Sequence, residues 1–511
     1  MAISQDPGDP TYRRDIGSGN LVLRWSTAED KAGCIMLSCL SVMEQEGKES
    51  EWAVRFLEPY TDDAFHAGSS TNWAICIDTS PIETPPKTGS DSYTDKMRLA
   101  AESAPERVVA AVYFLPSQFT FDGDAVRVPV GKAHILACKA VYRGRGGAEN
   151  IMNALFEMVN ARAHATGCAF MAMAGIPAYY RAHGYEYALN MGRGLVTHVS
   201  ALNPSSSPAS APSLFSLRPA TLDDLPALER FVLAPRTKAE IFTGAKDSAT
   251  LTAQLRYLLG DRPPAYTSPA YPVDPFFVLE KRDVPDASPR VVAAAGIRLS
   301  KPGAPTAVVH PLLWDGVEDA FAVAQAIVRP LVSAVGALPP ADGSPNKLVS
   351  LRWTLPDAHP LYRWLVAHEL AIPTPESSRY DLMHVWWVGI HSLPRFLESL
   401  APVFNARLAG SSQIFGANYA ATLHIAAPRA MGGGVVLRIA NGSVSVAPAN
   451  AQQDPKPNLT LPRGALVQLM MGYAGWRELK ALYPDVAIEP AVVPLVDVLF
   501  PKRSFWSALY I

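Results

Sequence analysis

The stretch Lys139–Ile151, KAVYRGRGGAENI, decides how the rest of the chain is interpreted. The β-rich run HILAC (134–138) precedes it, and the amphipathic run IMNALFEMVNARA (151–163) follows it, so we expect a strand, a basic turn and a helix. Glycine lets the backbone approach a ligand closely, and the free N–H groups at a helix N-terminus attract phosphate oxygens. Arg143 and Arg145 add positive charge. The turn is therefore a candidate phosphate-binding loop, and a basic turn without a ligand is the simpler alternative.

A second motif follows about thirty residues later. The apolar run GCAFMAMAG (167–175) predicts a strand, and Tyr180-Arg181-Ala182-His183-Gly184-Tyr185 comes directly after it. The spacing from Arg143 to Ala148 is arginine, two residues, glycine, one residue, alanine, which differs from the GxxxxGKS loop of nucleotide-triphosphate proteins. In this order the two motifs resemble those of the GCN5-related N-acetyltransferases, in which the loop holds the diphosphate of acetyl coenzyme A.

The resemblance implies roles for individual residues. Leu136 and Cys138 would offer backbone groups to the pantetheine arm of the coenzyme, and Tyr180 would be the general acid. The pyrophosphate would be held by Arg143, Gly144, Arg145, Gly146, Gly147 and Ala148. Two alternatives stay open: Tyr180 packs under the coenzyme without catalysing, and the Cys138 thiol is structural.

Composition bounds the class of protein. With 511 residues, 49% apolar and 18% charged, we expect two to four globular domains. The net charge of −2 gives no reason to expect nucleic acid or an anionic membrane as a partner. The five cysteines form no CxxC pair, so we expect free thiols, no metal site and a cytoplasmic protein. No apolar run reaches 18 residues, so we expect no membrane span.

An internal repeat indicates a second domain. LRWSTAED (23–30) and LRPATLDD (217–224) share leucine, arginine, threonine and a final aspartate. We therefore expect a flexible lead at 1–19, an acetyltransferase domain at 20–202, a linker at 203–213 and a second acetyltransferase-like domain at 214–388. After the third strand-like run of the second copy come Asp315, Glu318 and Asp319, where coenzyme phosphates would need cations. The second copy is predicted not to bind coenzyme A.

The last part of the chain, 389–511, has a different pattern. A helix is expected near Ser392, then strands that include a hairpin at Asn441-Gly442, and a helix after the run LTLP (459–462). This part resembles the sterol-carrier-protein fold. The fold class expected overall is α/β (α+β): tandem acetyltransferase folds with mixed sheets flanked by helices, followed by an α+β domain.

This domain order resembles that of the enhanced-intracellular-survival class of N-acetyltransferases. The resemblance implies a homo-oligomer, as large as a hexamer, that transfers an acyl group from acetyl coenzyme A to a primary amine of a small cationic molecule or a lysine side chain. It also implies that the third domain packs on the first and places the terminal carboxylate of Ile511 in the active site as a candidate base. The alternatives are that this carboxylate only attracts the acceptor ammonium, or that the terminus is frayed.

The chemistry requires groups of this kind. A lysine-like ammonium has a pKa of about 10.4 and must lose a proton before it attacks, and a departing thiolate with an intrinsic pKa near 8.5 can take a proton from a tyrosine. A terminal carboxylate, with a pKa of roughly 3.5 in water, needs apolar burial to act as a base. A lipid-binding or scaffolding protein with a vestigial first domain is the competing hypothesis. The first copy keeps the cationic loop that the second has lost, which favours the enzyme.

Overall fold

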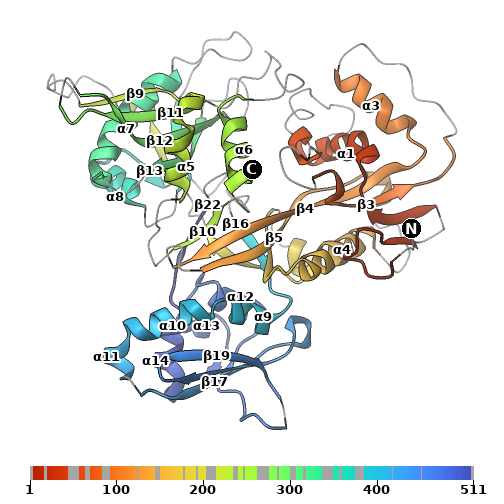
Figure 1. Cartoon of the computed structure of the whole chain (residues 1–511), viewed down its shortest axis with the longest axis vertical. Coiled ribbons are helices and arrows are strands. Elements are labelled where there is room, and N and C mark those ends of the chain that lie inside the picture. Colours follow the sequence, from red (N-terminus) through yellow and green to blue (C-terminus); the bar gives the residue numbers. More distant parts are fainter. Residues whose placement is uncertain are drawn as a thin grey trace.

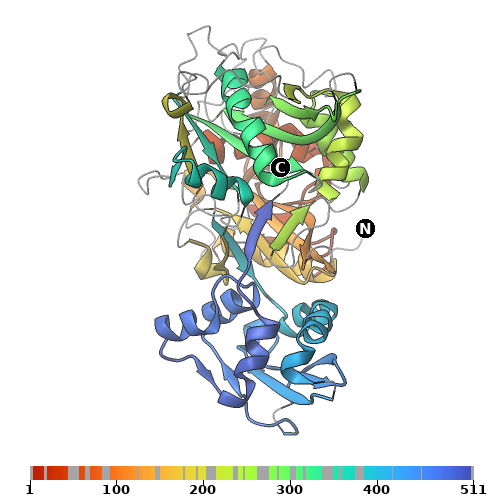
Figure 2. The same ribbon diagram turned by 90° about the vertical axis from the view of Figure 1, so that its left-hand side faces the viewer.

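The computed structural model describes residues 4–16, 20–43, 57–61, 63, 69–82, 93–122, 126–143, 150–175, 179–190, 194–202, 214–233, 240–244, 248–261, 275–284, 287–299, 306–314, 318–336, 349–355, 359–373, 385–416, 418–450 and 452–507. They form three sheets, each with its own helices (Figure 1). Two of these units lie side by side above the third in one view (Figure 1), and the third again lies below them in the perpendicular view (Figure 2).

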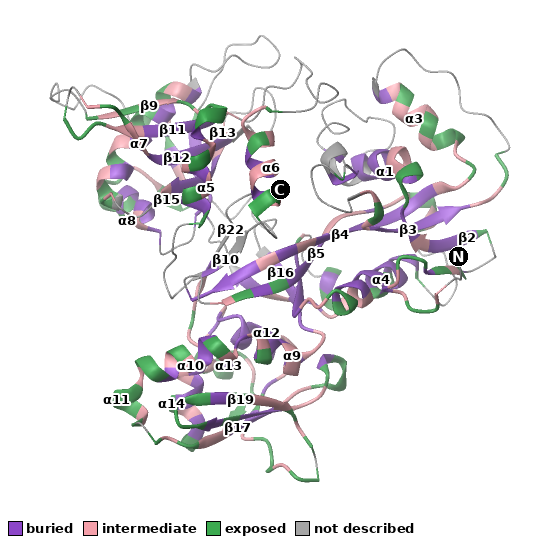
Figure 3. Ribbon diagram, in the orientation of Figure 1, coloured by how far each residue is buried: buried purple, intermediate pink, exposed green. Residues whose placement is uncertain are grey.

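The first sheet has the order β1-β2-β3-β4-β5-β6-β16-β7, and β10 joins the far end of β4 and carries β22 on its other edge. The strands are β1 (Arg13–Ile16), β2 (Leu21–Trp25), β3 (Trp73–Asp78), β4 (Arg107–Phe121), β5 (Val126–Cys138), β6 (Phe170–Ala174), β7 (Glu186–Asn190), β10 (Glu240–Gly244), β16 (Val385–Gly389) and β22 (Ser504–Ser507). The central strand β4 is buried along most of its length, and its neighbour β5 is buried mainly from Val130 to Ala133 (Figure 3).

Helices cover both faces of this sheet. One face packs on α1 (Lys31–Met43) and α3 (Tyr93–Ser103), and the other packs on α4 (Ile151–Ala165). The alternation of strand side chains explains the two layers: Ala110, Val112 and Phe114 of β4 lie in the α4 cluster, and Ala111 and Tyr113 lie in the α1 cluster. The strand and the helix expected on either side of the basic turn are confirmed as β5 and α4, and residues 144–149 of the turn lie outside the described residues.

The second sheet has the order β15-β8-β14-β13-β12-β11-β9. Its strands are β8 (Leu195–His198), β9 (Phe215–Pro219), β11 (Phe276–Lys281), β12 (Arg290–Leu299), β13 (Thr306–Trp314), β14 (Ser350–Trp353) and β15 (Ile372–Pro373). Its helices are α5 (Leu225–Leu233), α6 (Ser248–Leu258), α7 (Ala320–Gly336) and α8 (Pro360–Ala367). Separate apolar clusters fill its two faces, one under α5 and α6 and the other under α7 and α8.

The internal repeat is a structural repeat. In the first copy both terminal nitrogens of Arg24 donate to the Asp30 carboxylate, at 2.7 and 2.8 Å, and Arg24 also contacts Glu106. In the second copy Arg218 makes the same pair of bonds to Asp224, again at 2.7 and 2.8 Å. Each aspartate also caps the helical turn in which it lies, so arginine and aspartate together join the first strand of each copy to its first helix.

The two copies exchange strands. β8, which falls within the segment 20–202, pairs with β14 and β15 in the second sheet. β16, which starts within the segment 214–388, lies between β6 and β7 of the first sheet. The expected segments are continuous in sequence, but the sheets are interleaved, because strand pairing between distant segments leaves no local mark in sequence.

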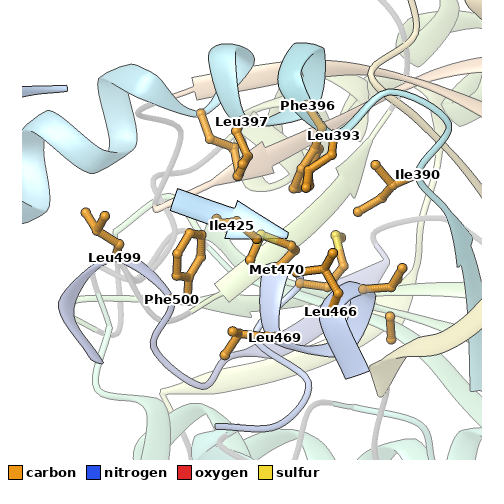
Figure 4. Close-up of a cluster of buried hydrophobic side chains, with 14 of the residues drawn as sticks. Ile390, Leu393, Phe396, Leu397, Ile425, Leu466, Leu469, Met470, Leu499 and Phe500 are labelled. Carbon is orange, nitrogen blue, oxygen red and sulfur yellow. The ribbon is translucent and has the colours of Figure 1, made fainter. Parts of the chain in front are cut away.

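The third unit is a five-stranded sheet of order β19-β18-β17-β20-β21 covered by helices. Its elements are α9 (Leu393–Ser399), α10 (Ala401–Gly410), α11 (Ser412–Phe415), β17 (Ala421–Ala426), β18 (Val435–Ala440), β19 (Ser443–Pro448), β20 (Leu459–Thr460), α12 (Arg463–Met470), α13 (Trp476–Leu482), β21 (Ala487–Ile488) and α14 (Val493–Leu499). The helix near Ser392 and the Asn441-Gly442 hairpin are confirmed, with Ser392 capping α9 and both turn residues at positive φ. Leu466, Met470 and Phe500 fill the interior (Figure 4).

The third unit is joined to the first by charged groups and by its last strand. The buried Asp122, which follows β4, accepts from Arg407 of α10 at 2.7 Å and forms an ion pair with Arg503 at 2.7 Å. Arg463 of α12 donates to the Gly184 carbonyl at 2.8 Å. The chain then enters the first sheet as β22, which leads upward from the third unit and pairs with β10 (Figure 2).

Candidate active site

Strands β5 and β6 run side by side and then separate. They pair in parallel only where Val130, Gly131 and Lys132 face Phe170, Met171 and Ala172. The other edge of β6 pairs with β16 from Met171 to Ala174, and beyond Lys132 β5 keeps only its pairing with β4 as far as Cys138. Within the described chain no strand therefore pairs with the β6-facing edge of β5 from Ala133 to Cys138. The backbone groups on this edge are available to a ligand that lies between the strands.

A bulge in β5 lies inside this unpaired stretch. The register between β4 and β5 shifts by one residue, so that Tyr113 faces His134 and Val112 faces Leu136. Ile135 is the extra residue, and its φ of 49° lies in the left-handed region, which is unusual for a β-branched side chain. Such strain is found at sites where the backbone has to be redirected. Leu136 and Cys138 follow the bulge, and both side chains pack half-buried in the α4 cluster.

The turn after β5 is anchored at its start. The Tyr142 hydroxyl donates to the Asp78 carboxylate at 2.5 Å, and Arg107 lies 3.5 Å from the same carboxylate. Burial acts to raise the pKa of Asp78, but hydrogen bonds from Ser80 and Tyr142, together with the Arg107 charge, lower it to about 2. A carboxylate that stays ionised thus holds the first residues of the turn against β3.

Arg143, the next residue, is exposed, and its Nε donates to the Cys138 carbonyl at 3.3 Å. Gly144, Arg145, Gly146, Gly147 and Ala148 lie outside the described residues. The chain is described again from Asn150, whose side chain accepts from the backbone of Met152 and caps α4. The described parts therefore place an exposed arginine after β5 and the N-terminus of α4 close behind it in sequence.

Tyr180 lies at the end of β6. It belongs to a short helical segment, Tyr179–His183, and only 5% of its surface is exposed. Its ring packs edge-on against Phe156 of α4 and Trp387 of β16. A Cβ added to Gly175 would lie 2.5 Å from the Tyr180 hydroxyl oxygen, so this hydroxyl rests on the backbone of the residue that follows β6. Gly175 thereby makes room for the phenol at the open end of the separated strands.

Sequence reasoning missed two residues at this site. Tyr179 packs on Tyr180, with ring centroids 5.2 Å apart, and burial raises the pKa of its hydroxyl. Its only signal in the sequence is its position beside Tyr180. Lys132 is the other: it is buried and lies where β5 and β6 separate. A lysine inside the apolar stretch from Val128 to Ala133 was the sequence feature that could have identified it.

The terminal carboxylate of Ile511 lies outside the described residues. The strand that leads to it is described: β22 runs parallel to β10, which in turn pairs antiparallel with β4. Phe505 of β22 packs on Phe119 and Trp386, with ring centroids 5.6 and 5.2 Å apart. The last described residues of the chain thus lie on the first sheet, within the copy that carries Tyr180.

The same place in the second copy is built differently. Glu318 binds Lys281 at 2.8 Å and also pairs with Arg290, while the Asp319 carboxylate accepts from the backbone of Ala322 in α7. Asp315 lies outside the described residues. Tyr362 of α8 donates to the Trp353 carbonyl at 2.6 Å and accepts from Leu355 N–H at 2.8 Å. The tyrosine hydroxyl of this copy is therefore bound to the end of β14.

Fold and topology define the class. Two mixed sheets that exchange strands, each with a central pair of parallel strands, form tandem GCN5-related acetyltransferase folds, and the fold class expected from sequence is confirmed. No family model and no curated protein matches the sequence. Within the described residues, no helix is both long enough and apolar enough to cross a bilayer.

Solved structures match over nearly the full length. A GCN5-related N-acetyltransferase from Anabaena variabilis has a TM-score of 0.58 and 14% identity, covering 96% of this chain and 99% of that one. Eis1 from Mycobacterium abscessus has a TM-score of 0.55 and 14% identity, covering 96% and 100%. A GCN5-related N-acetyltransferase from Kribbella flavida has a TM-score of 0.54 and 16% identity, covering 96% and 98%. At these identities the likeness establishes the fold and leaves the activity to be argued from the site.

Proposed function

We propose that the first copy is an acyl coenzyme A dependent N-acyltransferase. The observation that carries the proposal is the separation of β5 from β6 beside Tyr180. A pantetheine arm is an extended chain with amide groups, and the unpaired edge of β5 from Ala133 to Cys138 presents the backbone donors and acceptors that such a chain needs. The similarity to solved N-acetyltransferases supports the same class of activity.

The arginines that follow β5 give the proposed direction of the substrate. Arg143 lies beyond the end of β5, and Arg145 is two residues further in sequence. The diphosphate of the coenzyme would bind there, near the N-terminus of α4. Its arm would then run back along β5 past Cys138 and Leu136. The acyl group would lie toward Lys132, where the two strands meet.

Transfer proceeds by direct attack of a neutral amine on the thioester carbon. The C–N bond forms, the C–S bond breaks, and the thiolate takes a proton from the Tyr180 hydroxyl. The nitrogen that has attacked loses one proton, which returns through solvent to the Tyr180 oxygen, so that the products are the amide and the coenzyme thiol. An ordinary phenol has a pKa near 10, which lets it donate to a thiolate of intrinsic pKa near 8.5 once that thiolate develops in a water-poor site. The Ile511 carboxylate stays the proposed base for the acceptor ammonium, and a primary amine of a small cationic molecule or a lysine side chain stays the proposed acceptor.

The alternative, a lipid-binding or scaffolding protein, rests on the resemblance of the third unit to sterol carrier proteins. The interior of that unit is filled by its own side chains, among them Leu469, Leu495 and Val496, all fully buried. We therefore propose neither lipid binding nor scaffolding for the third unit.

Calorimetric titration of acetyl coenzyme A tests the proposal. We expect Arg143→Ala with Arg145→Ala to weaken binding roughly ten- to a hundred-fold, because each charge-assisted hydrogen bond to phosphate contributes about 1.5–3 kcal/mol and solvent screens part of that contribution. Arg477→Ala is the matched control: this arginine is exposed on α13 and pairs with Asp497, so the variant should bind like the wild type. Absence of heat with the wild-type protein would refute the proposal.

A further inference from the structure

Lys132 is a buried amine for which the proposed mechanism has no use. Its side chain is 92% buried, since 8% of its surface is exposed. The described residues supply it with no ion pair. Instead, its Nζ lies 5.3 Å from the ring centroid of Trp386 and 5.9 Å from that of Phe119. Lysine is almost never fully buried unless it is paired, so this arrangement calls for an explanation.

Lys132 lies beside the opening between β5 and β6, which begins where the two strands stop pairing. It is the last residue of β5 that pairs with β6, so it stands at the point where the two strands separate. Its direct partner on β4, Leu115, lies in the α1 cluster, and directly paired residues point to the same face. Lys132 therefore projects from the face opposite α4. Tyr180 packs on the α4 side, so the amine and the phenol approach the opening from opposite faces.

The surroundings of Lys132 favour its neutral form. Burial lowers the pKa of its amine to about 7. The neighbouring strands β6, β16 and β22 contain no charged residue, while β4 has only Arg107, at its far end, and β10 only Glu240, at the end of that strand opposite Gly244. At neutral pH a larger share of Lys132 amines is thus uncharged than for a lysine in water, whose pKa is about 10.4. Desolvated lysines of this kind act as nucleophiles.

We propose that Lys132 is a site of self-acylation, taking the acyl group from acyl coenzyme A bound in the first copy. The inference rests on the proposed function, because it places the acyl end of the substrate toward the junction of β5 and β6. The lone pair of neutral Nζ forms a C–N bond with the thioester carbon, and the C–S bond breaks with its electron pair on sulfur. The amine proton passes to that sulfur, with the Tyr180 hydroxyl as the carrier. The products are an acyl-lysine and the free coenzyme thiol.

Acylation of Lys132 also removes an unfavourable buried charge. An ammonium buried without a counter-ion is unfavourable, and an amide carries no charge, so acylation relieves the burial penalty of Lys132. Three aromatic rings stand around the site, since Phe505 of β22 packs on both Phe119 and Trp386. An acylated side chain would remain among apolar neighbours.

The test uses the full chain, acetyl coenzyme A as the probe, and peptide mass spectrometry. We expect an acetyl group on Lys132 in preference to Lys480, an exposed lysine of α13 that reports unassisted acylation by the thioester. The rate at Lys132 should rise as the pH is raised through about 7 and level off above it, because its neutral fraction then saturates. Lys132→Arg should remove the modification, and Tyr180→Phe should slow it at Lys132 but not at Lys480.

The outcomes separate this inference from the proposed function. If calorimetry shows that acetyl coenzyme A binds and the Lys132 peptide stays unmodified, self-acylation is wrong and the transferase proposal stands. If Lys132 and Lys480 are modified at equal rates, or if Tyr180→Phe slows both equally, the reaction is unassisted and the inference is again wrong. If the wild-type protein binds no acetyl coenzyme A, both proposals fail together.

Discussion

The two copies of the repeat share an anchor and differ at the site. Arg24 with Asp30, and Arg218 with Asp224, make the same bidentate contact at the same distances. After the corresponding central strands, however, the first copy has an exposed arginine, whereas the second has Glu318 bound to two cations. Contacts that hold a strand to a helix are needed in every copy, but charges that would bind a substrate are needed in only one.

The tyrosines give the largest expected difference between the copies. Tyr180→Phe should lower kcat/KM for acyl transfer by about a hundred-fold or more, since general acid catalysis contributes about 10²–10⁴. Tyr362→Phe should leave kcat/KM unchanged, because its hydroxyl serves the backbone of β14. The activity of both variants is measured as steady-state release of the coenzyme thiol, with an acceptor amine identified in a screen.

The tyrosine comparison needs structural controls. Loss of the Tyr362 hydroxyl should lower the free energy of unfolding by about 1–3 kcal/mol, because a carbonyl and an N–H lose their buried partner. Tyr180→Phe should retain the wild-type melting temperature and calorimetric affinity for acetyl coenzyme A. Gly175→Ala should displace the Tyr180 ring and lower activity while keeping the hydroxyl. Equal activity losses in Tyr180→Phe and Tyr362→Phe would contradict the assignment of the site to the first copy.

The anchors should differ in strength although their geometry is the same. Arg24 is 11% exposed and Arg218 is 37% exposed, so removing the aspartate leaves a more deeply buried charge in the first copy. We expect Asp30→Ala to cost about 3 kcal/mol and Asp224→Ala about 1–2 kcal/mol, of which roughly 1 kcal/mol in each is the lost helix cap. Hydrogen exchange at α1 and α5 measures the two copies separately. A larger loss at α5 would show that exposure does not set the difference.

The smallest expected effects are changes in the free energy of unfolding with pH and with salt. The depressed pKa of Asp78 contributes stability that is present above the ordinary carboxyl pKa of about 3.9 and is lost as the pH falls toward 2. Tyr142→Phe removes one hydrogen bond and should cost about 1 kcal/mol at pH 6 and less at pH 2. In the second copy Glu318→Gln should cost less than Tyr142→Phe in about 0.5 M salt, since salt screens the pairs that Glu318 makes with the partly exposed Lys281 and Arg290. Denaturant unfolding at pH 6 and at pH 2, and in low salt and about 0.5 M salt, measures these free energies and tests their order.

Particular residues show what sequence can predict here. Two eight-residue segments, 23–30 and 217–224, were enough to predict the repeat. In each of them an arginine, a threonine and an aspartate at fixed spacing form one local network. The Asn441-Gly442 turn was found because few residues tolerate positive φ. The exchange of β8 and β16 was not found, because each strand pairs with segments far away in the chain. Lys132 was missed because burial, which alters its chemistry, is a property of the folded chain.

At the candidate site, the sequence identified positions and the structure added their relations. Leu136, Cys138 and Tyr180 were chosen from motifs, and they lie around the opening between β5 and β6. Their roles toward a coenzyme stay predictions, as do those of the loop residues and Ile511. The bulge at Ile135 carries no signature that the motif could reveal, because it arises from a mismatch in strand length between β4 and β5.

The exchange of strands bears on how the chain is made. A ribosome synthesises β6 and β7 long before β16, which lies between them, and β22 is synthesised later still. Until β16 is made, the nascent first copy holds β6 and β7 with open edges, and such edges pair readily with other chains. Completion of the first sheet must therefore wait until β16 and β22 have been synthesised. A protein translated only to residue 202 would be an aggregation hazard for the cell, even though it contains both motifs of the first copy.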